Sequence, residues 1–184
     1  QSKHIRRLYA ARSLAMSPAW SPDGSVCAAA LSFDGNTDIC LISREGKLLK
    51  RLTTDSGIDC EPSWSPDGKR LAFVSSRGGS PQVYVLDVAT GAVRRLTFAG
   101  SYNTSPAWSP RGERIAFASR AEGGFEVFVM NADGGNVQQL TSGKGSNEAP
   151  CWSPDGVLLA FSSTRLGGSR IFIMNADGTN QRPV

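Results

Sequence analysis

The chain has 184 residues, of which 40% are hydrophobic, and a formal net charge of +4. This apolar content is sufficient for a folded core, so the composition excludes a disordered chain. No apolar run approaches the roughly 20 residues that span a bilayer, and the first residues lack the uninterrupted apolar segment of a signal peptide. Twenty glycines and ten prolines favour many short strands joined by tight turns.

A repeat of 44 residues runs through the whole sequence. Its strongest marker is a tryptophan followed by Ser-Pro, one further residue and Gly, and it occurs at Trp20, Trp64, Trp108 and Trp152. A proline stands two residues before each tryptophan, and a further apolar series keeps the same step at Leu8, Leu52, Leu96, Leu140 and Val184. Several markers with one constant spacing indicate four tandem copies of a structural unit.

In chain order, the first predicted element is an N-terminal strand within residues 1–8. Residues 5–8 lie 44 positions before residues 49–52, so they have the register of an outer fourth strand without a blade of their own. The four copies follow as residues 16–53, 60–97, 104–141 and 148–184. Together they are expected to form a single unit, residues 1–184.

Each copy is expected to contain four short strands. In the second copy these are predicted at residues 60–64, 70–76, 83–86 and 93–97. The first two are joined by Ser65-Pro66-Asp67-Gly68, which fits a type I turn. Both faces of the second strand are apolar or small, so each copy needs a neighbour on either side. The pattern predicts an all-β propeller of four four-stranded antiparallel blades.

The second copy resembles the repeat of the TolB-type β-propeller family. The residues that carry the resemblance are Pro62-Ser63-Trp64-Ser65-Pro66-Asp67-Gly68-Lys69-Arg70-Leu71-Ala72-Phe73, then Val83-Tyr84-Val85-Leu86-Asp87 and Arg94-Arg95-Leu96-Thr97. The resemblance covers essentially the whole chain. The sequence departs from TolB in having four blades rather than six and in lacking a separate α/β domain. The same blade type also occurs in propellers that gate prolyl-oligopeptidase-like enzymes.

Ring closure has three candidate arrangements: a closed four-bladed monomer, an eight-bladed ring of which each of two chains supplies half, and a piece of a larger propeller. Blades of the type found in six-bladed rings each subtend about 60°, which leaves an open arc and favours a two-fold homodimer. The last outer strand contains Pro183, which cannot donate a ladder hydrogen bond. We therefore predict that the N-terminal strand completes the last blade, in its own chain or by strand exchange with a partner chain.

Most conspicuous residues have a structural interpretation. The tryptophans are expected to pack between blades, and Asp23, Asp67 and Asp155 to form turns. The cysteines are interpreted as free thiols because Cys27 and Cys40 replace core residues of other copies and no pair has metal-ligand spacing. Basic residues guard exposed edges rather than bind nucleic acid, since seven of the 20 fall on predicted outer strands: Arg6, Arg7, Lys50, Arg51, Arg94, Arg95 and Arg182.

Catalysis finds no support in the sequence. There is no Gly-x-Ser-x-Gly elbow and no phosphate loop, and the single histidine, His4, lies beside the N-terminal strand. A serine or cysteine hydrolase would therefore lack its base. We predict no catalytic residue, no cofactor and no metal site.

The long loops are the predicted partner-binding face, because they gather at one end of the blades and differ between copies. Their candidate contact residues are Asp59, Glu61, Arg77, Tyr102, Asn103, Arg120, Asn147, Glu148 and Arg165. The arginines could recognise an anionic group, but a solvated position is favoured. A cation site at Asp59, Glu61 and Glu148 is weakly supported because only one blade supplies two acids.

These observations predict a non-catalytic protein-interaction scaffold with a protein or peptide partner. The alternative is a propeller that binds or gates a ligand or peptide for a hydrolase. The resemblance to the TolB type implies a periplasmic or otherwise extracytoplasmic location, and no direct insertion into a membrane is expected.

Overall fold

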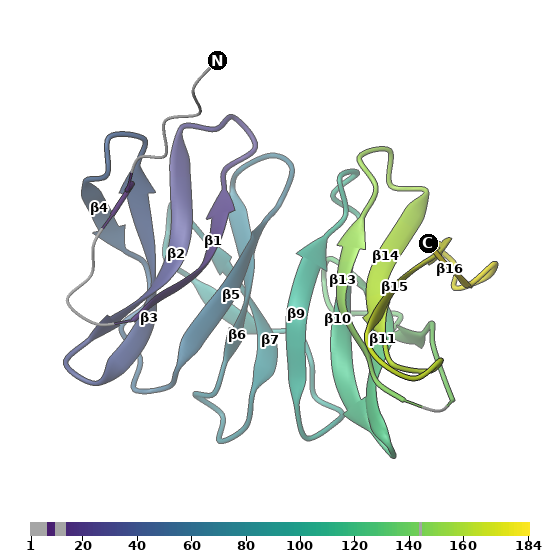
Figure 1. Cartoon of the computed structure of the whole chain (residues 1–184). Helices are drawn as coiled ribbons and strands as arrows, with labels where there is room; N and C mark the ends of the chain where they lie inside the picture. Colours follow the sequence, from purple (N-terminus) through teal and green to yellow (C-terminus); the bar gives the residue numbers. More distant parts are fainter. Residues whose placement is uncertain (1–6, 10–13, 144) are drawn as a thin grey trace.

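The computed structural model describes residues 7–9, 14–143 and 145–184. The described residues form sixteen strands in four separate antiparallel sheets, and consecutive strands are neighbours within each sheet. The sheets follow one another as the blades of a propeller (Figure 1). This confirms the predicted all-β propeller of four-stranded blades. No helix in the described part of the chain is long and apolar enough to cross a membrane.

The blades have similar strand bounds. Blade 1 contains β1 (Ala15–Trp20), β2 (Val26–Phe33), β3 (Asn36–Ser43) and β4 (Leu48–Arg51). Blade 2 contains β5 (Asp59–Trp64), β6 (Arg70–Ser75), β7 (Gln82–Asp87) and β8 (Val93–Arg95). Blade 3 contains β9 (Asn103–Trp108), β10 (Arg114–Ala121), β11 (Gly124–Asn131) and β12 (Gln138–Gln139). Blade 4 contains β13 (Asn147–Trp152), β14 (Leu158–Ser163), β15 (Arg170–Asn175) and β16 (Arg182–Pro183).

A bulge in the first strand of each blade explains the repeated proline. Pairing with the second strand shifts register between the start of the first strand and its tryptophan. The residue before each proline has a left-handed backbone, with φ of 50°, 54°, 51° and 52° at Ser17, Glu61, Ser105 and Ala149. A bulged segment lies outside the regular ladder, so a proline there removes no pairing hydrogen bond.

Apolar seams hold neighbouring blades together. The largest fully buried side chains include one phenylalanine at the same repeat position in each of blades 2, 3 and 4: Phe73, Phe117 and Phe161. Each belongs to a cluster that joins its own blade to the preceding one. Two tryptophans add polar links, since the indole N–H groups of Trp64 and Trp152 donate to backbone carbonyls of the preceding blades at 3.0 Å.

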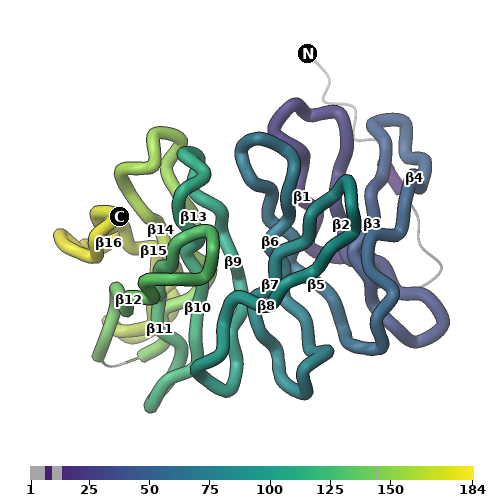
Figure 2. The backbone as a smooth tube through the Cα atoms, turned by 180° about the vertical axis from the view of Figure 1, so that it is seen from behind, coloured from purple at the N-terminus to yellow at the C-terminus, as the bar shows by residue number. Residues whose placement is uncertain are grey.

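The four blades form an open arc. Blades 1 and 4 lie at opposite ends of the molecule in both views (Figures 1 and 2). The closed four-bladed ring that was one candidate arrangement is therefore not formed. Trp20 of blade 1 has no described blade before it and is 52% exposed, whereas Trp108 is only 7% exposed.

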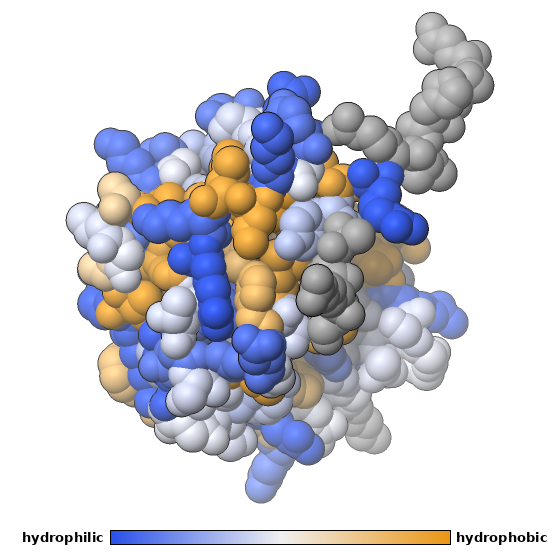
Figure 3. Space-filling model, turned by 90° about the vertical axis from the view of Figure 1, so that its left-hand side faces the viewer, coloured by the Kyte–Doolittle hydropathy of each residue, from blue (hydrophilic) through white to orange (hydrophobic). Residues whose placement is uncertain are grey.

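The open face of blade 1 is apolar. Hydrophobic side chains gather in the middle of this side of the molecule, with hydrophilic ones around them (Figure 3). A pocket of about 180 Å³ lies there, lined by Leu8, Tyr9, Ala15, Met16, Pro18, Cys27, Ala29, Leu31 and Ile42. In a closed propeller this face would be buried by a preceding blade.

Leu8 and Tyr9 lie against blade 1. A Cβ atom added at Gly46 would collide with the carbonyl of Leu8, just as one at Gly134 would press on Leu96. Leu8 thus occupies the place of an outer strand from a preceding blade, while residues 1–6 of the predicted strand lie outside the described residues. Blade 4 has its own short outer strand, β16, in spite of Pro183. The outer strand of blade 4 is thus short but present, and Leu8 lies against blade 1 rather than completing blade 4 within this chain.

Candidate partner-binding face

Strand pairing brings the long loops to one end of the blades. In blade 2, Asp59 pairs with Ser75 and Ser75 pairs with Gln82. The start of β5, the end of β6 and the start of β7 therefore share an edge, from which two loops emerge. Blades 3 and 4 have the same register. The loops that carry the candidate contact residues thus lie at one common end.

Buried polar links fix these loops to the blades. At the seam between blades 2 and 3, the Thr97 hydroxyl and the Asn103 amide both donate to Oε1 of Gln82, each at 2.7 Å. At the next seam, Thr141 and Asn147 donate to Glu126 at 2.5 and 2.8 Å, in positions equivalent to those of Thr97 and Asn103. Each link joins the third strand of one blade to the first strand of the next. The loop between them is therefore held on a rigid base.

The seam between blades 1 and 2 carries two buried carboxylates instead. Asp38 pairs with Arg51 at 2.5 Å, and Asp59 pairs with Arg77 at 2.9 Å. Burial raises the pKa of Asp38, the neighbouring Asp59 raises it further, and Arg51 opposes both effects. The second carboxylate oxygen of Asp59, Oδ1, is buried without a hydrogen-bond partner in the described residues. The negative charges of Asp38 and Asp59 are thus each compensated by one arginine, Arg51 and Arg77 respectively.

Arg77 and Arg165 occupy the seams rather than the solvent, so the solvated interpretation of these two residues was wrong. The guanidinium of Arg77 lies over the rings of Phe73 and Tyr84, 5.6 and 5.3 Å from their centres, and donates to Asp59. Arg165 repeats the arrangement: it lies over two phenylalanine rings and donates to Oδ1 of Asn147 at 2.7 Å. Both also donate through Nε to a serine hydroxyl, at 2.8 and 3.0 Å.

The seam between blades 2 and 3 lacks such an arginine. The 44-residue step from Arg77 and Arg165 leads to Ala121, whereas Arg120 is exposed at the mouth of the seam. A pocket of about 230 Å³ is present at this place. Its lining residues are Thr97, Phe98, Ala99, Gly100, Asn103, Phe117, Ser119, Arg120, Phe128 and Val137. Among the described residues, no arginine guanidinium lies over the aromatic pair of blade 3, Phe117 and Phe128.

The chemistry of this pocket is aromatic with one unused acceptor. The rings of Phe117 and Phe128 are stacked with centres 5.6 Å apart. The Asn103 amide nitrogen donates to Gln82 and to a backbone carbonyl, which leaves its Oδ1 buried and without a partner in the described residues. Buried acceptors are normally satisfied, so this oxygen is an exception among the residues that line the pocket.

Two exposed aromatic side chains lie on the loop that begins and ends at pocket residues: Phe98 lines the pocket, and Tyr102 directly precedes Asn103. Phe98 is 76% exposed and lies beneath the guanidinium of Arg95 at 5.1 Å. Tyr102 is 38% exposed and meets Phe125 edge to face, with ring centres 5.6 Å apart. Aromatic and arginine side chains are the types most often found at the centre of protein interfaces.

The three candidate acids do not form one site. Asp59 is fully buried with Arg77, while Glu61 accepts hydrogen bonds from Thr104 at 2.7 Å and from the backbone of Ser105 at 2.6 Å. Glu148 accepts from a neighbouring serine hydroxyl. No group of three or more His, Cys, Asp or Glu side chains in the described ranges is placed to hold a metal ion.

The cysteines are free, and burial raises the pKa of three of their thiols, those of Cys27, Cys40 and Cys60. Burial raises the pKa of Cys40 to about 11 and that of Cys60 to about 12, with nearby carboxylates adding to the effect. Such thiols are neutral at ordinary pH and therefore poor nucleophiles. His4, the only histidine, lies outside the described residues.

Sequence reasoning named Tyr102, Asn103 and Arg120 but missed the pocket that Asn103 and Arg120 line. It grouped Arg120 with Arg77 and Arg165, although the repeat places Ala121 at that position. A strict 44-residue alignment would have revealed the missing arginine. The sequence could not predict the burial of Asp59, Asn103 and Asn147, because each stands at a boundary between loop and strand.

A family model and several solved structures match the chain. The family model described as the TolB beta propeller domain matches residues 1–184. TolB from Acinetobacter baumannii is 36% identical with a TM-score of 0.78, and the match covers 91% of this chain and 43% of that one. A putative TolB from Agrobacterium tumefaciens is 26% identical with a TM-score of 0.83, covering 91% and 63%. No curated protein sequence gave a match.

The chain spans less than two thirds of both TolB structures. A puromycin-hydrolyzing peptidase from Mycobacterium tuberculosis also matches, at 17% identity and a TM-score of 0.73, with 97% of this chain and 29% of that one covered. That likeness extends to the fold alone. The match of the family model over all 184 residues is decisive: the chain belongs to the TolB β-propeller domain family.

Proposed function

We propose that this chain is a non-catalytic interaction module that binds a protein or peptide partner at the long-loop end of its blades. The observation that carries the proposal is the uncovered pocket between blades 2 and 3. At the equivalent positions of the neighbouring seams, an arginine of the chain itself lies over the aromatic pair. An aromatic pocket that the chain does not fill is available to a side chain of another molecule.

The rim of the pocket supports a polypeptide partner. Phe98 and Tyr102 present apolar area on a loop whose base is fixed by the buried link between Thr97, Asn103 and Gln82. Because the loop is held in place, binding costs little ordering of the protein. Membership of the TolB family agrees with a protein-binding role.

Two further features belong to this proposal. A periplasmic or otherwise extracytoplasmic location is supported by the family resemblance alone. A homodimer is supported by the uncovered apolar face of blade 1 and by exposed apolar residues of blade 4, of which Ile171 is 55% exposed. Two arcs of four blades could cover these ends by closing an eight-bladed ring. The alternative role as a gating propeller for a hydrolase has no observation specifically in its favour.

The test is affinity capture of a partner, followed by titration of the purified partner against variants. Phe98→Ala and Tyr102→Ala remove the aromatic rim, and Ala121→Arg supplies the missing arginine and closes the pocket. We expect each to weaken binding at least about tenfold, as for central interface residues. Lys69→Ala, an exposed change in a turn at the opposite end, is the control and should bind like the wild type. Equal affinity in all four variants would contradict the proposed face.

A further inference from the structure

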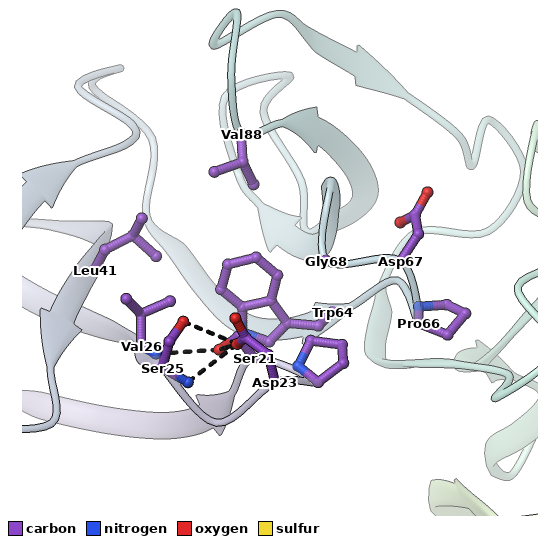
Figure 4. A pocket seen from close by; sticks show the side chains of 11 residues that line it. Ser21, Asp23, Ser25, Val26, Leu41, Trp64, Pro66, Asp67, Gly68 and Val88 are labelled. Atoms are coloured by element: carbon purple, nitrogen blue, oxygen red, sulfur yellow. Dashed lines mark hydrogen bonds between the residues drawn. The ribbon is translucent and has the colours of Figure 1, made fainter.

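A second cleft lies between blades 1 and 2 at their tight-turn end, away from the long loops. It has a volume of about 320 Å³. The indole of Trp64 lies in its middle, with Val26 and Leu41 of blade 1 on one side, Val88 of blade 2 above and Asp23 below (Figure 4). The cleft therefore combines an aromatic ring, apolar walls and a carboxylate.

Arginine fills the equivalent place at the next two seams. The guanidinium of Arg70 lies 4.9 Å from the ring centre of Trp108, and that of Arg114 lies 5.4 Å from the ring centre of Trp152. Each arginine begins the second strand of its blade, and the 44-residue step places Val26 at the same position in blade 1. A valine side chain is too short to lie over the next indole. The cleft over Trp64 is open because this arginine is missing.

A turn carboxylate also lines the open cleft. In blade 2 the turn residue is Asp67, whose pKa is lowered mainly by the Ser65 hydroxyl and the backbone of Lys69, with a smaller effect of Arg70. Asp23 is the equivalent residue of blade 1. All its hydrogen bonds, from Ser21 and Ser25, go to Oδ1, so Oδ2 is unused within the described residues. Trp64 and Asp23 thus place an indole face and a carboxylate oxygen without a partner in the described residues in one cleft.

We propose that this cleft binds the guanidinium of an arginine side chain from a partner polypeptide, stacked on Trp64 and facing Oδ2 of Asp23. A planar, delocalised cation matches the face of an indole and a carboxylate better than a compact ammonium does. The apolar walls formed by Val26, Leu41 and Val88 suit the methylene stem of arginine. The site is independent of the long-loop face.

The probe is the peptide acetyl-Gly-Arg-Gly-amide, titrated into the folded chain and followed through the tryptophan indole N–H signals by NMR. The Trp64 signal is assigned from a Trp64→Phe variant. The matching citrulline peptide has nearly the same shape but no charge. We expect the arginine peptide to shift the Trp64 signal and to bind at least about fivefold more tightly than the citrulline peptide. Equal binding of the two peptides, or no shift at Trp64, would overturn the site.

Variants separate the cleft from a general effect of charge. Val26→Arg supplies the arginine from within, so it should abolish peptide binding and raise the unfolding temperature. Leu158→Arg adds the same charge at the equivalent position of blade 4, where no further blade is described, and should leave binding unchanged. Asp23→Asn keeps Oδ1 for the turn and should weaken binding, which provides a test even if Val26→Arg does not fold. Undiminished binding in Asp23→Asn would contradict the proposal.

Discussion

Arg77 and Arg165 each place a positive charge in a seam between two blades. Each is held by two aromatic rings, a serine hydroxyl and a carbonyl or carboxylate oxygen. For Arg77 the partner is a carboxylate with no exposed surface, so the two charges depend on each other. In blade 3 the equivalent residues are uncharged: Asn103 replaces Asp59, and Ala121 replaces Arg77.

This comparison predicts a large effect for removal of Arg77 alone. Arg77→Ala leaves the charge of Asp59 buried, and we expect the free energy of unfolding to fall by about 3–5 kcal/mol. The double variant Asp59→Asn with Arg77→Ala reproduces the residues of blade 3 and should recover part of that loss. Urea unfolding of the two variants measures the difference. A double variant no more stable than the single one would show that the buried charge is not the cause.

Asp23 carries a prediction about acid stability. The hydroxyl of Ser21, then the backbone and hydroxyl of Ser25, lower its pKa from 3.8 to about 2. Because the folded pKa lies below the unfolded one, the contribution of Asp23 is present above pH 4 and is lost as pH falls towards 2. Asp23→Asn removes this titration. Between pH 4 and pH 2, its unfolding temperature should therefore decrease less than that of the wild type, and parallel curves would refute the assignment.

The first strand of each blade combines a left-handed residue, a proline and a tryptophan. The bulge moves the proline out of the ladder and sets the tryptophan against the neighbouring blade. Ala149 has a left-handed backbone, with φ of 52°, although its side chain has no polar group that could stabilise this conformation by a hydrogen bond. Left-handed backbone costs a residue with a Cβ about 1–2 kcal/mol.

Glycine at this position should therefore stabilise the chain. We expect Ala149→Gly to raise the free energy of unfolding by up to about 1 kcal/mol, because relief of strain exceeds the entropic cost of glycine. Ala107→Gly, in the equivalent strand of blade 3 but outside the left-handed region, should lower it by about 0.5–1 kcal/mol. Chemical denaturation of both variants gives the comparison. A similar decrease in both would mean that the bulge is unstrained.

The sequence was sufficient to predict the blades and insufficient to predict the pockets. The strands of blade 2 lie within two residues of their predicted bounds because proline, glycine and alternating apolar residues mark them locally. The pockets depend on single missing arginines, at Val26 and Ala121, and on aromatic rings from a different strand or blade. Such features arise only when blades pack, so the residue pattern of one blade cannot show them.

At the scale of the whole molecule, the two ends of the arc are unequal. Blade 1 exposes a face with an apolar pocket, partly covered by Leu8 and Tyr9. Blade 4 ends in the short strand β16 and exposes Val157, Leu166 and Ile171. A two-fold axis would place blade 1 of each chain against blade 4 of the other chain. The two contacts would close an eight-bladed ring in which both ends of each chain are covered.

The solution mass of the chain at micromolar concentration tests this account most directly. An arc with two uncovered apolar ends should associate, so light scattering is expected to give twice the 19.6 kDa of one chain. Substitution of the exposed Ile171 by aspartate should shift the distribution towards the single chain, because it places a charge in the buried contact. A strict monomer of the unaltered chain at these concentrations would contradict the prediction that the uncovered ends of the arc bind a second chain.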